Sequence, residues 1–170
     1  MMDEVAGCRS ENLTDAEVEL SKLLLTLNAF CALDRDIIQV IADGSRIINY
    51  EAGDTIYSHG EFDGEYLIGV LSGHVRAVAN AQMVGDIEVS EYSVGDTIGL
   101  LPLIAQRKSV ALPIAVTSMQ NCQIVFLESS ILLTLLENDI RFSSAIATFS
   151  ALNALRNPVE YDAESEAERR

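Results

Sequence analysis

The chain has 170 residues, of which 49% are hydrophobic, so it is long enough to bury the core of one domain. Its net charge of −15 argues against binding to nucleic acid or to an anionic membrane surface, because clustered Lys and Arg side chains make both kinds of contact. No apolar run approaches the ~20 residues of a membrane span. The start has no basic and apolar leader, and Cys8, Cys31 and Cys122 have no metal-ligand spacing. We therefore expect a cytoplasmic protein with reduced thiols, no membrane insertion and no cofactor.

Two short helices are predicted near the N-terminus, after a flexible segment over residues 1–13. Thr14 and Glu17 form a capping box, in which a hydroxyl and a carboxylate satisfy the first backbone donors of a helix. Asp34 is the expected N-cap of the second helix, and Gly44 is its expected end. The residues predicted to be buried are Val18, Leu20, Leu23, Leu24 and Leu27 in the first helix, Phe30 and Leu33 between the two, and Ile37, Ile38, Val40 and Ile41 in the second.

From Arg46 onward the helical period gives way to short β-rich runs separated by glycine turns, a pattern typical of a sandwich or barrel. Two turns are near copies with five identities, Tyr50-Glu-Ala-Gly-Asp-Thr-Ile56 and Tyr92-Ser-Val-Gly-Asp-Thr-Ile98. Two equivalent corners of a double Greek key would produce such a pair, and a chance match is the less favoured explanation. The predicted strands are Ile47–Tyr50, Thr55–Tyr57, Tyr66–Leu71, Val75–Ala79, Ile87–Tyr92, Ile114–Val116 and Ile124–Leu127.

The helical period returns after the last predicted strand and indicates two further helices. Ser129 or Ser130 is expected to cap the first, and Asn138-Asp139 separates it from the second. The last helix is expected to reach about Leu155 and to end before Pro158, and residues 158–170 form an acidic tail expected to be disordered. The apolar positions are Ile131, Leu132, Leu135 and Leu136 in the first of these helices, and Phe142, Ala145, Ile146, Phe149 and Leu152 in the second.

This order of helices and glycine-punctuated strands resembles the cyclic nucleotide-binding domain family, which includes catabolite-activator-type regulators, kinase regulatory subunits and gated channels. The resemblance covers roughly Leu23 to Leu155 and implies an α+β fold over residues 14–157, a double-stranded β-helix (a jelly-roll-like β-roll) flanked by N-terminal and C-terminal helices. Each matching segment is short, and their order along the chain is what is specific. The segments are Phe30-Cys-Ala-Leu33, Tyr50-Glu-Ala-Gly53-Asp-Thr-Ile56, His59-Gly60-Glu61, Tyr66-Leu67-Ile68, Gly73-His-Val75 and Gly95-Asp96-Thr-Ile98-Gly99.

The resemblance also implies a phosphate-binding cassette after the second Gly-Asp turn. In the family it reads Gly-Glu, a short helix and then Arg-Ser/Thr-Ala, with the Glu on the ribose 2′-hydroxyl and the Arg on the cyclic phosphate. Here Leu100 follows Gly99, so the ribose carboxylate is missing. Aligned backwards from Ala115, the Arg-Ser-Ala positions fall on Leu112-Pro113-Ile114, and Pro113 removes a backbone N–H that would face the phosphate.

A second alignment of the arginine remains open. Counted forwards from Gly99, Arg107 arrives slightly early with Lys108 beside it, and extra residues must then loop out. We prefer the first register, because a slip of one residue would reverse the faces of the following strand and loops absorb gaps at small cost. In the first register a cyclic nucleotide should bind very weakly. If Arg107 or Lys108 turns inward, weak anion binding survives without recognition of the ribose.

Catalytic and metal-binding patterns are weaker. His59 and His74 form no HxH pair of the kind expected in a cupin-type metal site, and polar turn residues explain them better. A lone His74 is very weak support for a haem-ligating gas sensor. Ser58-His59 and Ser72-Gly73-His74 have no acid partner in the sequence pattern. We therefore expect no catalytic residue and no metal ligand.

The expected function is that of a non-enzymatic regulatory or adaptor module with a weakened or lost nucleotide site, acting through protein–protein interaction. A working sensor of a cyclic nucleotide or another small anion is the alternative, and a cupin-like jelly-roll enzyme is the least favoured class. The expected partner is another protein or a second copy of the chain, although the same helix face has equal reason to pack on the domain's own roll. That face comprises Phe142, Ile146, Phe149 and Leu152.

Overall fold

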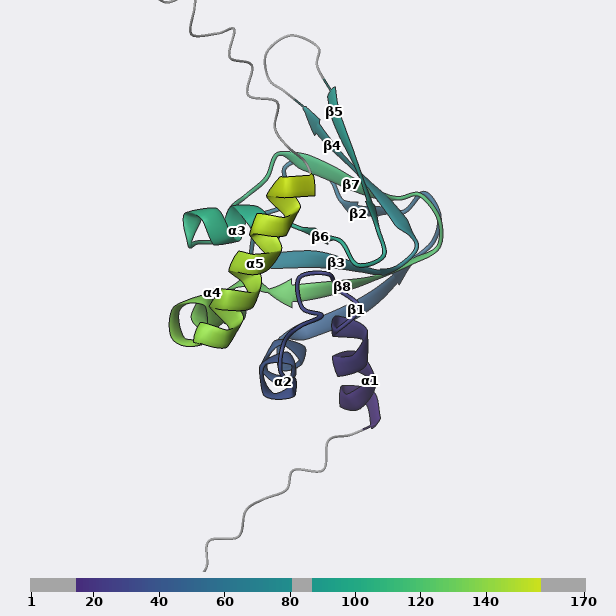
Figure 1. The fold of residues 1–170 in the computed structure, drawn as a ribbon. Coiled ribbons are helices and arrows are strands. Elements are labelled where there is room, and N and C mark those ends of the chain that lie inside the picture. Colours follow the sequence, from purple (N-terminus) through teal and green to yellow (C-terminus); the bar gives the residue numbers. More distant parts are fainter. Residues whose placement is uncertain (1–14, 81–86, 157–170) are drawn as a thin grey trace, which may run out of the picture.

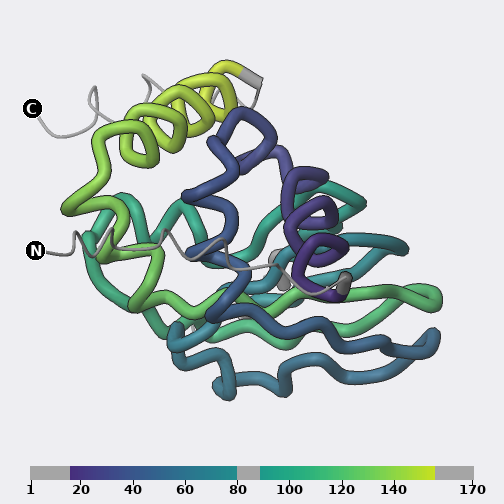
Figure 2. Tube along the Cα trace, turned by 90° about the horizontal axis from the view of Figure 1, so that it is seen from below, coloured from purple at the N-terminus to yellow at the C-terminus, as the bar shows by residue number. Residues whose placement is uncertain are grey.

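The computed structural model describes residues 15–80 and 87–156 and confirms the α+β class, with two antiparallel sheets and helices along one side of the strands (Figures 1 and 2). The strand order is β1-β8-β3-β6 in one sheet and β2-β7-β4-β5 in the other. This arrangement is the predicted β-roll. The strands are β1 Ser45–Tyr50, β2 Thr55–Tyr57, β3 Tyr66–Ser72, β4 His74–Asn80, β5 Ile87–Ser93, β6 Thr97–Ile98, β7 Ile114–Ser118 and β8 Cys122–Glu128.

The centre of the first sheet is buried on both of its faces. β3 and β8 read as nearly continuous apolar runs, and most of their side chains are buried, as expected for strands that are covered from both sides. Leu27, which follows helix α1 (Asp15–Leu24), packs so closely on β3 that a Cβ at Gly69 would lie 2.8 Å from its methyl groups. Gly69 therefore allows the N-terminal segment to sit directly on the sheet.

The remaining helices complete the cover of the roll. They are α2 Arg35–Asp43, α3 Leu100–Gln106, α4 Ser129–Asn138 and α5 Ile140–Arg156. The rings of Phe30 and Phe142 lie with their centroids 6.4 Å apart, and both side chains are fully buried. Contact between these two rings joins the segment before α2 to the first turn of α5, so the N-terminal and C-terminal helices share one core.

Several sequence predictions need correction. Val18, Val40 and Leu152 are exposed (38%, 45% and 54%) because each lies on the outward side of its helix, although each fits the apolar period. β6 was not predicted, since two residues show no alternation. Neither Ser129 nor Ser130 is the N-cap of α4: Glu128 holds that position, and the Ser129 hydroxyl instead donates to the carbonyl of Gly64.

Other predictions hold in position but differ in chemistry, and some cannot be compared. Asp34 is the N-cap residue of α2, but its carboxylate binds Arg141. Gly44 is the C-cap with a φ of −100°, and a Cβ there would lie 2.1 Å from Ile131 Cδ1, so close packing explains this glycine. The flexible segment 1–13, the Thr14 position of the capping box, Pro158 and the tail 158–170 lie outside the described residues.

Candidate functional site

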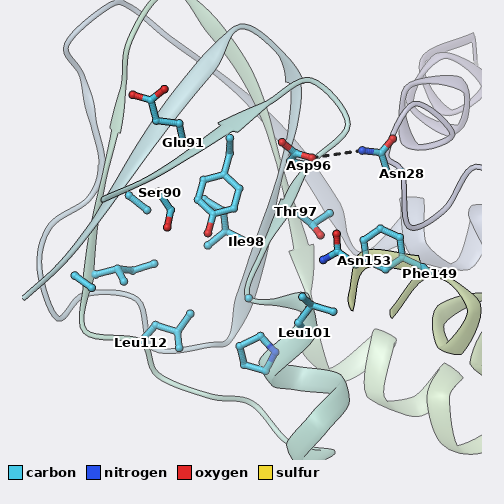
Figure 3. A pocket seen from close by; sticks show the side chains of 16 residues that line it. Asn28, Ser90, Glu91, Asp96, Thr97, Ile98, Leu101, Leu112, Phe149 and Asn153 are labelled. Carbon is cyan, nitrogen blue, oxygen red and sulfur yellow. Dashed lines mark hydrogen bonds between the residues drawn. The ribbon is translucent and has the colours of Figure 1, made fainter. Parts of the chain in front are cut away.

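A cavity of about 490 Å³ lies between the β4–β5 sheet, the start of α3 and the C-terminal half of α5 (Figure 3). This volume is in the range of small-molecule sites in proteins. Its walls come from segments that are far apart in the sequence. The lining residues are Asn28, Ala77, Ala79, Ser90, Glu91, Tyr92, Asp96, Thr97, Ile98, Gly99, Leu101, Pro102, Leu112, Ile114, Phe149 and Asn153.

Residues 92–98, which we call the second Gly–Asp turn, form one wall of the cavity. Residues 50–56 are the first Gly–Asp turn. The backbone N–H of Ser93 donates to Asp96 Oδ2 at 2.9 Å, and Asn28 Nδ2 donates to Asp96 Oδ1 at 3.4 Å. Gly95 has a φ of 96°, in the region that favours glycine. Its carbonyl accepts the backbone N–H of Asn28 at 2.8 Å. The Asp96 carboxylate therefore holds the turn and ties it to the segment between α1 and α2.

Gly99 and α3 form the next part of the wall. Gly99 has a φ of 92°, and a Cβ on it would lie 2.8 Å from both Leu67 Cδ2 and Phe62 Cζ. Leu100, which the family resemblance aligns with the ribose carboxylate, is 2% exposed and belongs to the core. The residues that line the cavity at this point are Leu101 and Pro102. Because proline has no backbone N–H, the first turn of α3 offers one donor fewer to an anion.

The predicted cassette residues after α3 divide into two groups. Leu112 and Ile114 line the cavity, whereas Arg107, Lys108 and Pro113 are exposed and do not belong to its lining. The backbone N–H of Leu112 donates to the Phe62 carbonyl at 3.0 Å and so fixes this segment over the roll.

Arg107 has another contact. It ends α3 with a φ of 52°, and its Nη1 donates to the carbonyl of Leu136 in the last turn of α4 at 3.5 Å. A cation near a helix C-terminus is favourable, because the free carbonyls there carry partial negative charge. The guanidinium of Arg107 thus contacts α4 and not the cavity.

The β4–β5 wall separates small residues from charged ones. Ala77 and Ser90 are register partners that line the cavity; Glu91 also borders it, but its place in the strand directs its carboxylate to the outer face, towards its register partner Arg76. There Glu91 accepts Arg76 Nη2 at 3.0 Å and contacts His74 Nε2 at 3.2 Å. The hydrogen bonds from Arg76 and then His74 lower the pKa of the Glu91 carboxyl. Arg76 is therefore engaged away from the cavity.

Comparison with protein families decides where this architecture belongs. The family described as "Cyclic nucleotide-binding domain" matches residues 47–139, more than half of the 170-residue chain. The chain belongs to the cyclic nucleotide-binding domain family. The match confirms the resemblance found in the sequence and the β-roll with flanking helices. A search of the curated proteins finds no match.

Solved structures with this fold include regulators and one enzyme. The sensor domain of the transcriptional regulator DNR from Pseudomonas aeruginosa is 12% identical, with a TM-score of 0.68 over 88% of this chain and 98% of that chain. The regulatory domain of Toxoplasma gondii PKA with cAMP is 18% identical, with a TM-score of 0.61 over 82% of this chain and 50% of that one. A cAMP-binding acyltransferase from Mycobacterium smegmatis is 15% identical, with a TM-score of 0.62 over 84% of this chain and 43% of that one. At these identities the likeness shows the fold, and this chain spans half or less of the last two.

In this cyclic nucleotide-binding domain, α5 has two different halves. Phe142 and Ile146 are fully buried in the domain's own core. Phe149 and Asn153, one and two turns further on, line the cavity. Leu152 points away from the core and is 54% exposed. The predicted interaction face is therefore partly used within the domain.

The start of α5 is tied to α2 by a charge cluster around Arg141. Its guanidinium lies 3.1 Å from Asp34 Oδ2, 2.8 Å from Asp36 Oδ2 and 2.9 Å from Asp139 Oδ2. Hydrogen bonding to Arg141 holds the pKa of Asp36 and of Asp139 below its ordinary value, and the carboxylates in turn raise the pKa of Arg141. Asp139 also accepts the N–H groups of Arg141 and Phe142, so it caps α5 and lies at the break between the two helices that the sequence predicted at Asn138-Asp139.

The described residues contain no group of three or more His, Cys, Asp or Glu side chains that could hold a metal ion. No helix in residues 15–80 and 87–156 has the length and apolar character needed to cross a membrane. Cys31 and Cys122 are both free. Sequence reasoning missed Asn28, Ser90 and Asn153 because they come from segments that carry no cassette motif. It included Thr97 only as part of the second Gly–Asp turn and gave it no role at the site.

Proposed function

We propose that this domain is a non-enzymatic regulatory or adaptor module whose cavity does not grip the phosphate of a cyclic nucleotide. The charge of the cavity wall carries this proposal. The described residues that line it include no Lys, Arg or His, and its charged members are the acids Asp96 and Glu91. Burying the negative charge of a cyclic phosphate without a cationic partner is strongly unfavourable, so the wall disfavours this ligand.

The position of Leu112 supports the same conclusion. The family resemblance aligns Leu112 with the arginine that pairs with the phosphate, and this leucine lines the cavity. Removing one partner of a buried ion pair costs about 3–5 kcal/mol, which weakens a micromolar site to about millimolar. Losing the ribose carboxylate at Leu100 adds about 1–3 kcal/mol. We therefore expect cyclic nucleotides to bind too weakly to regulate the domain.

The exposed end of α5 supports a role in protein–protein contact. Leu152 and Leu155 are 54% and 78% exposed on α5, and neither of them lines the largely apolar groove of about 510 Å³ between α3 and α5. Exposed apolar patches of this kind mark interaction sites. The proposed partner is another protein or a second copy of the chain, with Leu152 contributing more than the buried Phe142 and Ile146.

Thermal unfolding with cyclic AMP and cyclic GMP tests the nucleotide part. At millimolar concentration neither should raise the melting temperature of the wild-type chain, whereas Leu112→Arg, which adds a cation to the wall, should gain a measurable rise. A ligand at a hundred times its Kd stabilises by about 2.7 kcal/mol, which moves the melting temperature by several degrees. A rise of that size in the wild type would overturn the proposal.

Arg107→Ala and Lys108→Ala serve as the matched variants for the sensor alternative. If either side chain turns inward to hold an anion, the wild type should show the nucleotide-dependent rise and the variant should lose it. Under the proposal both variants respond to nucleotide as the wild type does, because Arg107 contacts the Leu136 carbonyl and not the cavity.

Affinity capture from cells that express the chain tests the contact part. A partner, or a tagged second copy, should be retained by the wild type and lost by Leu152→Glu. Val89→Glu is the control, because Val89 is similarly exposed, at 51%, but lies on β5. Capture that Leu152→Glu leaves unchanged would contradict a role for this part of α5.

A further inference from the structure

We infer that the cavity binds an uncharged, partly apolar small molecule, with its polar end at the second Gly–Asp turn and its apolar end beside α3. This assignment rests on the proposed function, because it presupposes that the cavity does not hold a cyclic phosphate. It adds to the proposed function the chemical class of the ligand that the cavity binds.

The apolar part of the wall favours burial of a hydrocarbon surface. Ile98, Leu101, Leu112, Ile114 and Phe149 all line the cavity, and they come from β6, α3, the segment before β7, β7 itself and α5. Transfer of an apolar group from water into such surroundings is favourable in proportion to the area buried. In Figure 3, Leu112 lies at the lower left of the view and Leu101 at its lower centre.

The polar part of the wall consists mainly of neutral groups. Asn28, Thr97 and Asn153 lie close to Asp96 at the opposite side of the view from Leu112 (Figure 3). Amides and hydroxyls both donate and accept hydrogen bonds, so they suit hydroxyl, carbonyl or amide groups of an uncharged ligand. The two oxygens of Asp96 already accept hydrogen bonds from Ser93 and Asn28, so this carboxylate does not require a cation.

The cavity shares two lining residues with the groove between α3 and α5. Leu101 and Asn153 line both spaces, and the rest of the groove is lined by Ile104, Ala105, Ser150 and Ala154. An elongated ligand can therefore place polar atoms near Asn153 and an apolar tail along Ile104. An anion finds no cationic side chain among the described residues of either wall. Shape and charge together select a neutral amphipathic compound.

Two dyes of comparable size but different charge test this selection. Nile red is neutral and partly apolar, and 1-anilinonaphthalene-8-sulfonate carries one negative charge. Titration of the native chain should give saturable Nile red fluorescence, with the anionic dye bound at least about tenfold more weakly because its sulfonate lacks a partner. Cyclic AMP at millimolar concentration should not displace Nile red.

Ser90→Phe and Val89→Phe locate the dye. Ser90 lines the cavity and Val89 is the adjacent exposed residue of the same strand, so the first variant fills the cavity and the second adds the same ring outside it. Nile red affinity should fall at least about tenfold in Ser90→Phe and stay unchanged in Val89→Phe. If Ser90→Phe does not fold, Ala79→Leu, at another lining position, should give the same loss.

The outcomes separate the two proposals. Displacement of Nile red by micromolar cyclic AMP would overturn the proposed function and the neutral-ligand assignment with it. Absence of saturable Nile red binding, equal binding of the anionic dye, or binding that survives in both cavity-filling variants would overturn the ligand assignment alone. In that case a melting temperature that millimolar cyclic AMP leaves unchanged would still support the proposed function.

Discussion

The first and second Gly–Asp turns have nearly the same sequence and the same internal hydrogen bonds, but different surroundings. In the first, the backbone N–H of Glu51 donates to Asp54 Oδ2 at 2.7 Å, and in the second the equivalent bond runs from Ser93 to Asp96 Oδ2 at 2.9 Å. The two glycines have φ values of 91° and 96°. The shared Gly-Asp pattern therefore specifies how the chain turns and leaves open whether a ligand site forms beside it.

The difference between the turns comes from the segments packed on them. A Cβ at Gly53 would meet nothing within 4 Å, whereas one at Gly95 would lie 3.0 Å from the Asn28 side chain. The last two residues of the second turn form β6, which leads directly into Gly99 and α3, and these form part of the cavity wall. Segments from elsewhere in the chain that pack against a turn thus decide whether that turn becomes part of a site.

The largest contrast is expected between the glycines that follow the two turns, Gly99 and Gly60. Both have a positive φ, 92° and 84°, so alanine at either position costs about 1–2 kcal/mol of backbone strain. At Gly99 the new methyl group would also lie 2.8 Å from Leu67 and Phe62, and at Gly60 it would meet nothing within 4 Å. Overpacking adds about 1–3 kcal/mol, so Gly99→Ala should lower the free energy of unfolding by about 2–5 kcal/mol.

Urea unfolding of the two variants measures this contrast. Gly60→Ala is the control for backbone strain without crowding. Equal losses in the two variants would show that Leu67 and Phe62 give way freely, and the close packing at Gly99 would then not explain the glycine.

A smaller contrast is expected between the turn glycines themselves. Gly53→Ala should cost about 1–2 kcal/mol from its positive φ. Gly95→Ala should cost up to about 1 kcal/mol more, because the methyl group crowds the Asn28 side chain and disturbs the hydrogen bond to Asp96. The free energies of unfolding of both variants, each made also in an Asn28→Ala background, form a double-mutant cycle. If the extra cost at Gly95 persists without the Asn28 side chain, the crowding has another source.

The repeat of the turns shows what the sequence could predict. Local patterns, namely the repeated Gly-Asp-Thr-Ile segment and the β-rich runs between glycines, identified both corners and most strand positions of the roll. The family match covers residues 47–139, the part of the chain that carries these turns and strands. Strand alternation also favoured the register that aligns the arginine position with Leu112, and Leu112 lines the cavity while Arg107 does not. That Leu112 occupies the position of the family's arginine stays a prediction.

What the sequence could not predict depends on contacts between distant segments. Asn28 contacts Asp96, and Arg141 contacts Asp34 and Asp36. The partners in each pair are far apart in the sequence, so the periodicity of a single helix or strand does not predict their contact. Leu100 and Leu101 are adjacent apolar residues, so only the orientation of α3 decides that the first enters the core and the second the cavity. Periodicity likewise could not show that Val18 and Val40 face solvent.

The smallest effect concerns α5, the helix that covers the second turn's cavity; the first turn borders a separate hollow of about 440 Å³, lined by Tyr50 and Glu51 among others and by no residue of α5. Arg141 lowers the pKa of Asp36 and Asp139, so the stability that these carboxylates contribute is present above their unfolded values of about 4 and is lost as the pH falls through the lower folded values. Arg141 and Asp36 are solvent-exposed and Asp139 is half-buried, so solvent screening should keep the effect modest. Arg141→Met should therefore be less stable than the wild type at pH 6, and the difference should shrink towards zero near pH 2, as measured by urea unfolding across this range.

Arg107→Met is the control, because Arg107 contacts a carbonyl and not a carboxylate, so its difference from the wild type should not vary with pH in this way. A deficit of Arg141→Met that stays constant from pH 6 to pH 2 would mean that the arginine acts through packing, and that α5 is held over the cavity without help from its ion pairs.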